Sequence, residues 1–266
     1  MRFVRYEHEG LARHGLVESD ASGTDWVVEL RGGLFDPPEP SGWRQPLAST
    51  RLLPPVIPGT FYAAGVNYMG HRRTHGEAPG APALPNAQHI GYRANNALIG
   101  HGDDIVVPAD SSGKVQFEGE LVVVIGKRAR NVPQERAMAC VFGYTIGNDV
   151  SERVWQKADR TFWRGKNSDT FKPMGPWIDT QARVEDMDTV VRLNGREVSR
   201  FRTADMVFGI AETIAAITRY ITLVPGDVIW MGTDDPTLDM VPGDVVEVEL
   251  TGLGVLRNRV VAESVR

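Results

Sequence analysis

FEGELVVVI, residues 117–125, is the stretch of this sequence that decides its fold class. Its second half, residues 121–125, is apolar throughout and mostly β-branched, which is typical of a buried strand. Because alternate residues of a strand share one face, Glu118 and Glu120 point to the same side, about 7 Å apart. Burial of two like charges is costly, so these carboxylates predict a compensating cation nearby.

Short β-forming runs recur along the chain and outnumber the helical segments. We expect strands at residues 2–6, 26–30, 61–67, 104–107, 115–125 and 143–148. Pro-Gly-Asp, at 225–227 and again at 242–244, presets a turn before another β-rich run. One short helix is expected to begin at Pro133, and a second has an apolar face made of Met206, Ile210, Ile214, Ile217 and Ile221. The pattern predicts a mixed α+β fold that is mainly β, with a strongly curved sheet and few short helices.

Two parts of unequal size are expected. Residues 1–58 form a small N-terminal β-rich domain, whose proline-rich stretch between residues 32 and 58 is typical of a linker or wrapping loop. Residues 59–266 form the main domain. A polar segment rich in glycine and proline, residues 69–86, is a candidate lid.

The composition is that of an ordinary globular protein. The 266 residues are 42% hydrophobic and 24% charged, with a formal net charge of −5 and a pI near 5.7, so no nucleic-acid partner is expected. The longest apolar runs are too short to span a bilayer, and the first ten residues lack the apolar core of a signal peptide. Cys140, the single cysteine, cannot form an intrachain disulfide. These features predict a soluble, cytoplasmic protein without a membrane partner.

A third acidic residue extends the pair of glutamates into a candidate metal site. Asp149 follows the β-rich run GYTIGN at residues 143–148. Three carboxylates, with water or substrate oxygens completing the shell, suit Mg²⁺, and Mn²⁺ or Ca²⁺ nearly as well. The alternative is that the two glutamates line a solvated strand face and that Asp149 caps a turn.

A histidine just past a predicted strand is a candidate general base. His71 ends the run Asn67-Tyr68-Met69-Gly70-His71, and histidine ordinarily titrates near neutrality, as a base in catalysis should. An exposed loop histidine is the alternative interpretation. His71 and His75 have helical spacing, but a zinc site is not favoured because the H-E-x-x-H pattern and a cysteine cluster are missing from the sequence.

From about Gly65 to the C-terminus, the sequence resembles the fumarylacetoacetate hydrolase superfamily, and in particular its acylpyruvate hydrolase-like members. The blocks that carry the resemblance are GVNYMGH, FEGELVVVIGK, GYTIGNDVSER, GKNSDTFKPMGPWI, LNGREV, PGDVIWMGT and PGDVVEVELTGLGVLRNRV. The resemblance implies a curved mixed β-sheet that forms a roll or barrel, and a homodimer. It also implies that Glu118, Glu120 and Asp149 bind the divalent cation.

The resemblance also assigns roles to residues around the metal site. It places the catalytic histidine at His71 and an active-site lysine at Lys166, within Arg164–Thr170. Arg153, Gln156 and Thr233 fall at substrate-binding positions. A small anionic substrate beside three acids requires such cations to offset repulsion.

Two departures from the family pattern bear on the chemistry. Thr74 stands where the family commonly has a glutamate that orients the histidine and activates water, so Glu77, or an acid from elsewhere in the chain, is a candidate water-activating acid. After Thr233, the sequence Asp234-Asp235-Pro236 replaces the usual proline-glycine continuation. Because that loop borders the pocket in the family, we expect a substrate preference of its own.

These features predict a Mg²⁺-dependent hydrolase that cleaves a carbon–carbon bond of a 2,4-dioxo acid, an acylpyruvate-like compound, to pyruvate and a carboxylate. Decarboxylation, hydration or isomerisation of a 2-oxo dicarboxylic acid at the same site is an alternative, because these reactions need no water-activating dyad of histidine and glutamate. A non-catalytic protein that binds a small acid is the second alternative.

Overall fold

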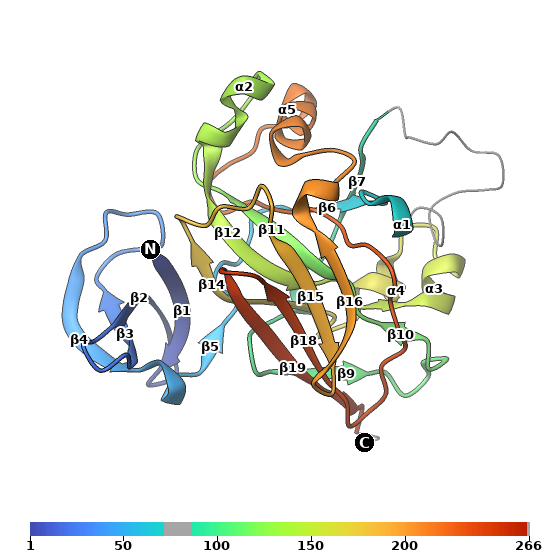
Figure 1. The fold of residues 1–266 in the computed structure, drawn as a ribbon, viewed down its shortest axis with the longest axis horizontal. Helices are drawn as coiled ribbons and strands as arrows, with labels where there is room; N and C mark the ends of the chain where they lie inside the picture. Colours follow the sequence, from blue (N-terminus) through green and yellow to red (C-terminus); the bar gives the residue numbers. More distant parts are fainter. Residues whose placement is uncertain (72–86, 265–266) are drawn as a thin grey trace.

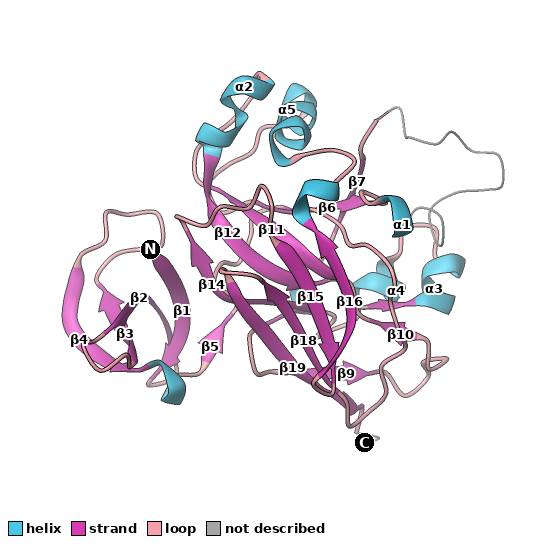
Figure 2. Ribbon diagram, viewed as in Figure 1, coloured by secondary structure: helices cyan, strands magenta, loops and turns pink. Residues whose placement is uncertain are grey.

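The structure is a computed structural model that describes residues 1–71 and 87–264. Most of the expected lid, residues 69–86, lies outside the described residues, and so do Thr74, His75 and Glu77. The described chain is mainly β with few short helices, as predicted (Figure 2). None of its helices combines the length and apolar character needed to cross a membrane.

The largest sheet of the described chain is a mixed sheet of twelve strands (Figure 1). Its path runs through β4 (Pro40–Pro46), β3 (Asp25–Leu30), β2 (Leu11–Ser19), β1 (Arg2–His8), β14 (Lys172–Asp179), β12 (Val141–Asn148), β11 (Gly119–Ile125), β17 (Val228–Trp230), β6 (Phe61–Gly65) and β7 (His89–Tyr92). Beside this path, β5 (Leu52–Leu53) pairs with β1, and β8 (Leu98–Ile99) with β14. The path begins at β4 and ends at β7, so within the described residues the sheet is open, and the barrel form of the expected roll or barrel is not found.

A second sheet of five strands packs against the first. Its order is β16 (Arg196–Arg202), β15 (Asp188–Leu193), β18 (Val245–Leu250), β19 (Gly254–Ala262) and β9 (Asp104–Val107). A small third sheet pairs β10 (Val115–Gln116) with β13 (Ser151–Glu152). The helices are α1 (Met69–His71), α2 (Gln134–Ala137), α3 (Arg153–Ala158), α4 (Trp163–Asn167) and α5 (Ile210–Tyr220). In Figure 1, α3 and α4 lie near α1, on the opposite side of the molecule from the N-terminal strands.

The alternation predicted for residues 117–125 divides the core into two clusters. Phe117, Leu121, Val123 and Ile125 pack with residues of β15 and β18, between the two sheets. Val122 and Val124 face the other way, toward a cluster that includes Trp230 and the N-terminal strands. A side chain at Gly119 would approach Val191 and Val248 within 2.9 Å, so glycine allows β11 to pass close to the second sheet.

The expected strand over residues 115–125 is interrupted, and the reason is a tertiary contact. β10 ends at Gln116 and β11 starts at Gly119. Between them, the Glu118 N–H donates to Asn148 Oδ1 at 2.9 Å, and the Glu118 carbonyl accepts the Asp149 N–H at 2.8 Å. Glu118 therefore sits at the end of the β11–β12 ladder and next to Asp149.

The proline-rich stretch between residues 32 and 58 contributes strands as well as loops. β4 adds to β3 at the edge of the large sheet, and β5 pairs with β1. The prolines of β4 lie at its two ends, Pro40 and Pro46, and an edge strand tolerates proline because one side of its backbone has no strand partner. The expected linker or wrapping loop therefore also contains two strands of the large sheet.

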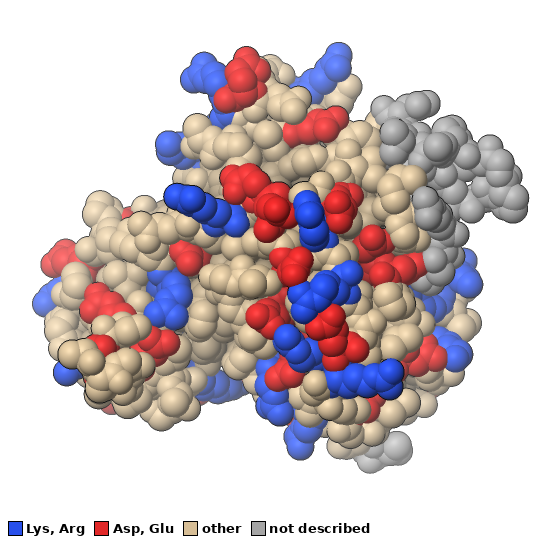
Figure 3. Space-filling model, in the orientation of Figure 1, with Lys and Arg blue, Asp and Glu red and all other residues tan. Residues whose placement is uncertain are grey.

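Charges of both signs mix over the face formed by the second sheet (Figure 3). Arg192 pairs with Glu249, Arg257 with Glu247, and Arg200 with Asp188. Such pairs on a solvated sheet add little stability individually. This face therefore presents no field of a single sign.

Candidate active site

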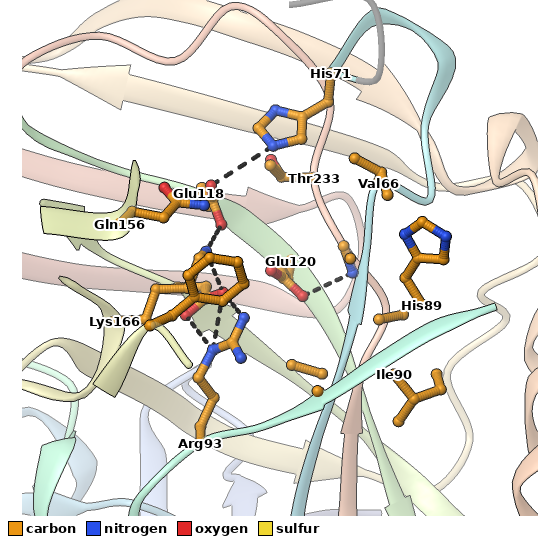
Figure 4. Close-up of a pocket in the computed structure, with 17 residues that line it drawn as sticks. Val66, His71, His89, Ile90, Arg93, Glu118, Glu120, Gln156, Lys166 and Thr233 are labelled. Atoms are coloured by element: carbon orange, nitrogen blue, oxygen red, sulfur yellow. Dashed lines mark hydrogen bonds and ion pairs between the residues drawn. The ribbon is translucent and has the colours of Figure 1, made fainter. Parts of the chain in front are cut away.

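A cavity of about 320 Å³ opens at the end of the large sheet near α1, α3 and α4. β6 and β7 form one wall, and the segment after β17 supplies Gly232 and Thr233. In Figure 4, Val66, His89 and Ile90 lie on one side and Gln156 and Lys166 on the other. The chemically active lining residues are His71, Arg93, Glu118, Glu120, Asp149, Gln156, Lys166 and Thr233.

The three acids predicted from the sequence come together in this cavity. One carboxylate oxygen from each of Glu118, Glu120 and Asp149 lies within 4.8 Å of the others, and all three side chains are buried. The pairing of β11 with β12 brings them together, because Gly119 lies opposite Asn148 in the ladder. Two neighbouring strand ends therefore hold the acids at one point.

Three cations surround Asp149. Arg93 donates to both of its oxygens, at 2.7 and 3.0 Å, Lys166 Nζ lies at 2.7 Å, and Lys172 Nζ at 2.8 Å. Burial alone would raise the pKa of Asp149, but these three charges hold it well below its usual value. Burial lowers the pKa of Lys172 to about 7, and the attraction of Asp149 opposes that effect.

Glu118 has two cationic partners. Lys166 Nζ lies 2.6 Å from one oxygen, and Arg153 Nη1 lies 2.5 Å from the other. Burial acts to raise the pKa of Glu118, but Lys166 and Arg153 outweigh it and lower the pKa below its usual value. Arg153 is itself held by Gln116 at 2.7 Å and by Gln156 at 2.8 Å.

Glu120 differs from the other two acids. In the described part of the chain it forms no ion pair, and its hydrogen bond comes from the Gly232 N–H at 2.7 Å. Burial, together with the charges of Asp149 and Glu118, raises the pKa of Glu120 well above its usual value. A buried carboxylate short of positive charge, beside two further carboxylate oxygens, suits a hard divalent cation. The donor set therefore fits the metal site that the sequence suggests.

His71 lies across the carboxylates from Arg93 in the view of Figure 4. Its Nε2 is 3.7 Å from Glu118 Oε1, and its Nδ1 is 3.1 Å from Asp235 Oδ1. The residue as a whole is 7% exposed, unlike the exposed loop histidine that was the alternative. His71 Nε2 therefore lies on the side of the acids, in the lining of the cavity.

The structure brings most of the predicted residues into one cavity. Gln156, Lys166 and Thr233 line it, whereas Arg153 stands behind Gln156 and meets Glu118 without being part of the lining.

Sequence reasoning missed Arg93 and Lys172 as neighbours of the site, and it placed Asp235 in a loop that borders the pocket without assigning it a role. Arg93 follows β7, a strand that was not predicted. The sequence does indicate that Lys172 is unusual, because it is a lysine at the start of the otherwise uncharged run KPMGPWI.

Comparison with known proteins places the chain in a family. A family model described as fumarylacetoacetate (FAA) hydrolase C-terminal matches residues 60–261, and one described as Rv2993c-like, N-terminal matches residues 1–55. A 2,4-didehydro-3-deoxy-L-rhamnonate hydrolase of Sphingomonas is 31% identical, with 98% of this chain and 96% of that protein covered. A mitochondrial oxaloacetate tautomerase of Bos taurus is 35% identical over 80% of this chain and 69% of its own length.

Solved structures agree with these matches. The crystal structure of a 5-carboxymethyl-2-hydroxymuconate delta-isomerase from Mycobacterium smegmatis superposes with a TM-score of 0.89, at 35% identity, and covers 99% of this chain and 100% of that one. The similar proteins thus include a hydrolase, a tautomerase and an isomerase, all named for small organic acids. Because one family model spans most of the sequence, and the Sphingomonas and Mycobacterium smegmatis proteins match it along nearly their whole length, this chain belongs to the fumarylacetoacetate hydrolase family of enzymes.

Proposed function

We propose that this protein is a divalent-metal-dependent hydrolase that cleaves a carbon–carbon bond of a 2,4-dioxo acid, an acylpyruvate-like compound, to pyruvate and a carboxylate. The observation that carries the proposal is the buried triad, whose carboxylate oxygens lie within 4.8 Å of one another, with His71 beside it. A divalent cation such as Mg²⁺, bound by Glu118, Glu120 and Asp149, would polarise the 2-oxo group and offset developing negative charge.

His71 and Lys166 are assigned the catalytic roles. His71 Nε2 accepts a proton from water, and the resulting hydroxyl adds to the carbon of the 4-oxo group. The bond between C3 and C4 then breaks and the C4 fragment leaves as the carboxylic acid. The electron pair of the bond stays on C3, which takes the proton from the His71 imidazolium to give pyruvate. Lys166 holds its positive charge between Glu118 and Asp149, at 2.6 and 2.7 Å, where it attracts the carboxylate of the substrate.

Three further residues are assigned to substrate binding. Gln156 and Thr233 line the cavity and offer an amide and a hydroxyl to substrate oxygens. Arg153 fixes Gln156 through a hydrogen bond of 2.8 Å and pairs with Glu118. We therefore expect Arg153 to act on the substrate through Gln156.

A second candidate is isomerisation, tautomerisation, decarboxylation or hydration of a 2-oxo dicarboxylic acid at the same site. The names of the bovine tautomerase and the mycobacterial isomerase favour it. A non-catalytic protein that binds a small acid is a third candidate, and the complete triad argues against it, because a binding role does not require three buried carboxylates at one point.

The test uses chelator-treated protein to which Mg²⁺ or Mn²⁺ is added back. A panel of acylpyruvates is assayed for pyruvate and free carboxylic acid in equal amounts, and oxaloacetate is assayed for carbon dioxide and for enol–keto exchange. Metal-dependent release of pyruvate with a carboxylic acid supports hydrolysis. Turnover of oxaloacetate alone favours the second candidate, an isomerase, tautomerase, decarboxylase or hydratase. Metal binding without any turnover favours the third candidate, a non-catalytic binding protein. Glu118→Gln serves as the control, since it should lose metal binding and activity together.

A further inference from the structure

Two neighbouring aspartates tie His71 to the loop after β17. His71 Nδ1 lies 3.1 Å from Asp235 Oδ1, and the His71 backbone N–H donates to Asp234 Oδ1 at 2.7 Å. The same Asp234 oxygen accepts the backbone N–H of Asp235 at 2.9 Å. The Asp234 carboxylate thus joins the backbone of His71 to that of Asp235, while the Asp235 carboxylate contacts the imidazole.

The surrounding residues keep this arrangement in place. A Cβ atom at Gly70 would overlap Asp234 Oδ1, so glycine allows α1 to approach the loop this closely. Before α1 in the chain, Asn67 Nδ2 donates to the carbonyl of Met231 at 2.9 Å, and Met231 directly follows β17. The segment that carries His71 is therefore held to the segment after β17 at Asn67 and at His71 itself.

The contact with Asp235 decides which imidazole nitrogen faces the cavity as a base. An ionised carboxylate only accepts hydrogen bonds, so the contact requires the proton on Nδ1. Nε2 then carries the lone pair, and it lies 3.7 Å from Glu118 Oε1, on the side of the triad (Figure 4). The side chains of His71 and Asp235 are 9% and 17% exposed, so bulk water competes weakly for this hydrogen bond.

From this geometry we infer that Asp235 is the positioning residue of His71: its carboxylate holds the imidazole in the tautomer whose Nε2 can accept a proton from water. The inference rests on the proposed role of His71 as the base. It assigns the orienting acid to the loop after β17, 164 residues beyond the histidine in sequence. Asp235 acts through His71, and its negative charge stabilises the imidazolium that forms when Nε2 takes the proton.

The test combines the tautomer of His71 with kinetics. In ¹⁵N-labelled, chelator-treated protein, the two-bond proton–nitrogen correlations of His71 report which ring nitrogen carries the proton. We expect Nδ1–H in the wild type and a shift toward Nε2–H in Asp235→Ala. With metal present, kcat of Asp235→Ala and Asp235→Asn should fall about 10²-fold or more with KM nearly unchanged, because an orienting carboxylate acts mainly in the transition state.

Two variants complete the design. Asp235→Glu keeps the carboxylate and should restore the Nδ1–H tautomer and part of kcat. Asp186→Asn, which alters an exposed pair with Arg202 at 3.0 Å, should change neither quantity. Titration of Mg²⁺ by calorimetry shows that each variant keeps a folded triad.

Either of two results overturns the inference: an unchanged tautomer in Asp235→Ala, or a shifted tautomer with wild-type kcat. If the wild type turns over none of the substrates, the proposed function fails separately, and the tautomer measurement still decides whether Asp235 positions His71.

Discussion

Glu120→Gln is the substitution that most directly tests the electrostatics of the triad. Glu120 is 2% exposed, lacks an ion pair in the described residues, and accepts one hydrogen bond from Gly232. Glutamine has nearly the same shape and can accept the same hydrogen bond, but it carries no charge. The variant should therefore be more stable than the wild type when metal is absent, although it should no longer bind metal.

The size of the effect follows from the pKa of Glu120, which the fold raises well above its usual 4.5. Between 4.5 and the raised value, the unfolded chain has released a proton that the folded protein still holds, so the stability of the wild type falls as pH rises. Within that range, each pH unit lowers the free energy of unfolding of the wild type by about 1.4 kcal/mol. The stability advantage of Glu120→Gln over the metal-free wild type should therefore be larger at pH 7.5 than at pH 5.5.

Urea denaturation of chelator-treated protein at the two pH values measures this difference. Adding Mg²⁺ or Mn²⁺ at 100 times its Kd should stabilise the wild type by about 2.7 kcal/mol and leave Glu120→Gln unchanged. Equal free energies of unfolding for the two proteins at both pH values would refute the reasoning, because Glu120 would then carry no uncompensated charge. A metal-dependent gain in the variant would refute its role as a ligand.

Three further substitutions test other parts of the structure. His71→Ala should lower kcat by about 10²–10⁴-fold while the calorimetric affinity for Mg²⁺ is kept, and wild-type turnover would exclude His71 as the base. Lys172→Met removes a buried cation that meets Asp149 and two backbone carbonyls, so it should lower the free energy of unfolding in urea by about 3 kcal/mol, and no loss would show that the other cations suffice for Asp149. Gly147→Ala places a Cβ 2.6 Å from the ring of Trp230, and thermal unfolding should show a loss of about 1–3 kcal/mol, which would be absent if the ring can move aside.

Elements with a regular pattern could be predicted from the sequence. The alternation in residues 117–125 placed its side chains correctly in two clusters, and the apolar face of α5 packs as its spacing predicts. The start of α5 could not be predicted. The spacing places it near Met206, but the backbone N–H groups of Val207 and Phe208 donate to Asn67, so the helix begins at Ile210. A contact across 141 residues leaves no local signal.

In the candidate site, too, some residues could be predicted from the sequence and others could not. The acids were found because two of them share a strand face and the third ends a neighbouring β-run. Their cationic partners depend on pairing across the fold: Arg93 reaches Asp149 from 56 residues away, after a strand whose short run HIGY has only a weak β pattern. The need for a cation could be derived from the cost of burying like charges, but the residue that supplies it could not.

The balance of charge around the cavity narrows the class of substrate. Four cationic side chains of the described chain form ion pairs with Glu118 or Asp149 of the triad. They are Arg93, Arg153, Lys166 and Lys172. Against the five carboxylates of the triad, Asp234 and Asp235 they leave a net charge of −1 when Lys172 is protonated, and a bound divalent cation would turn this into an excess of one positive charge. A low-dielectric cavity with this excess attracts a carboxylate and repels a cation. The excess therefore favours a 2-oxo acid over a neutral ketone, because only the acid replaces the missing negative charge within the cavity.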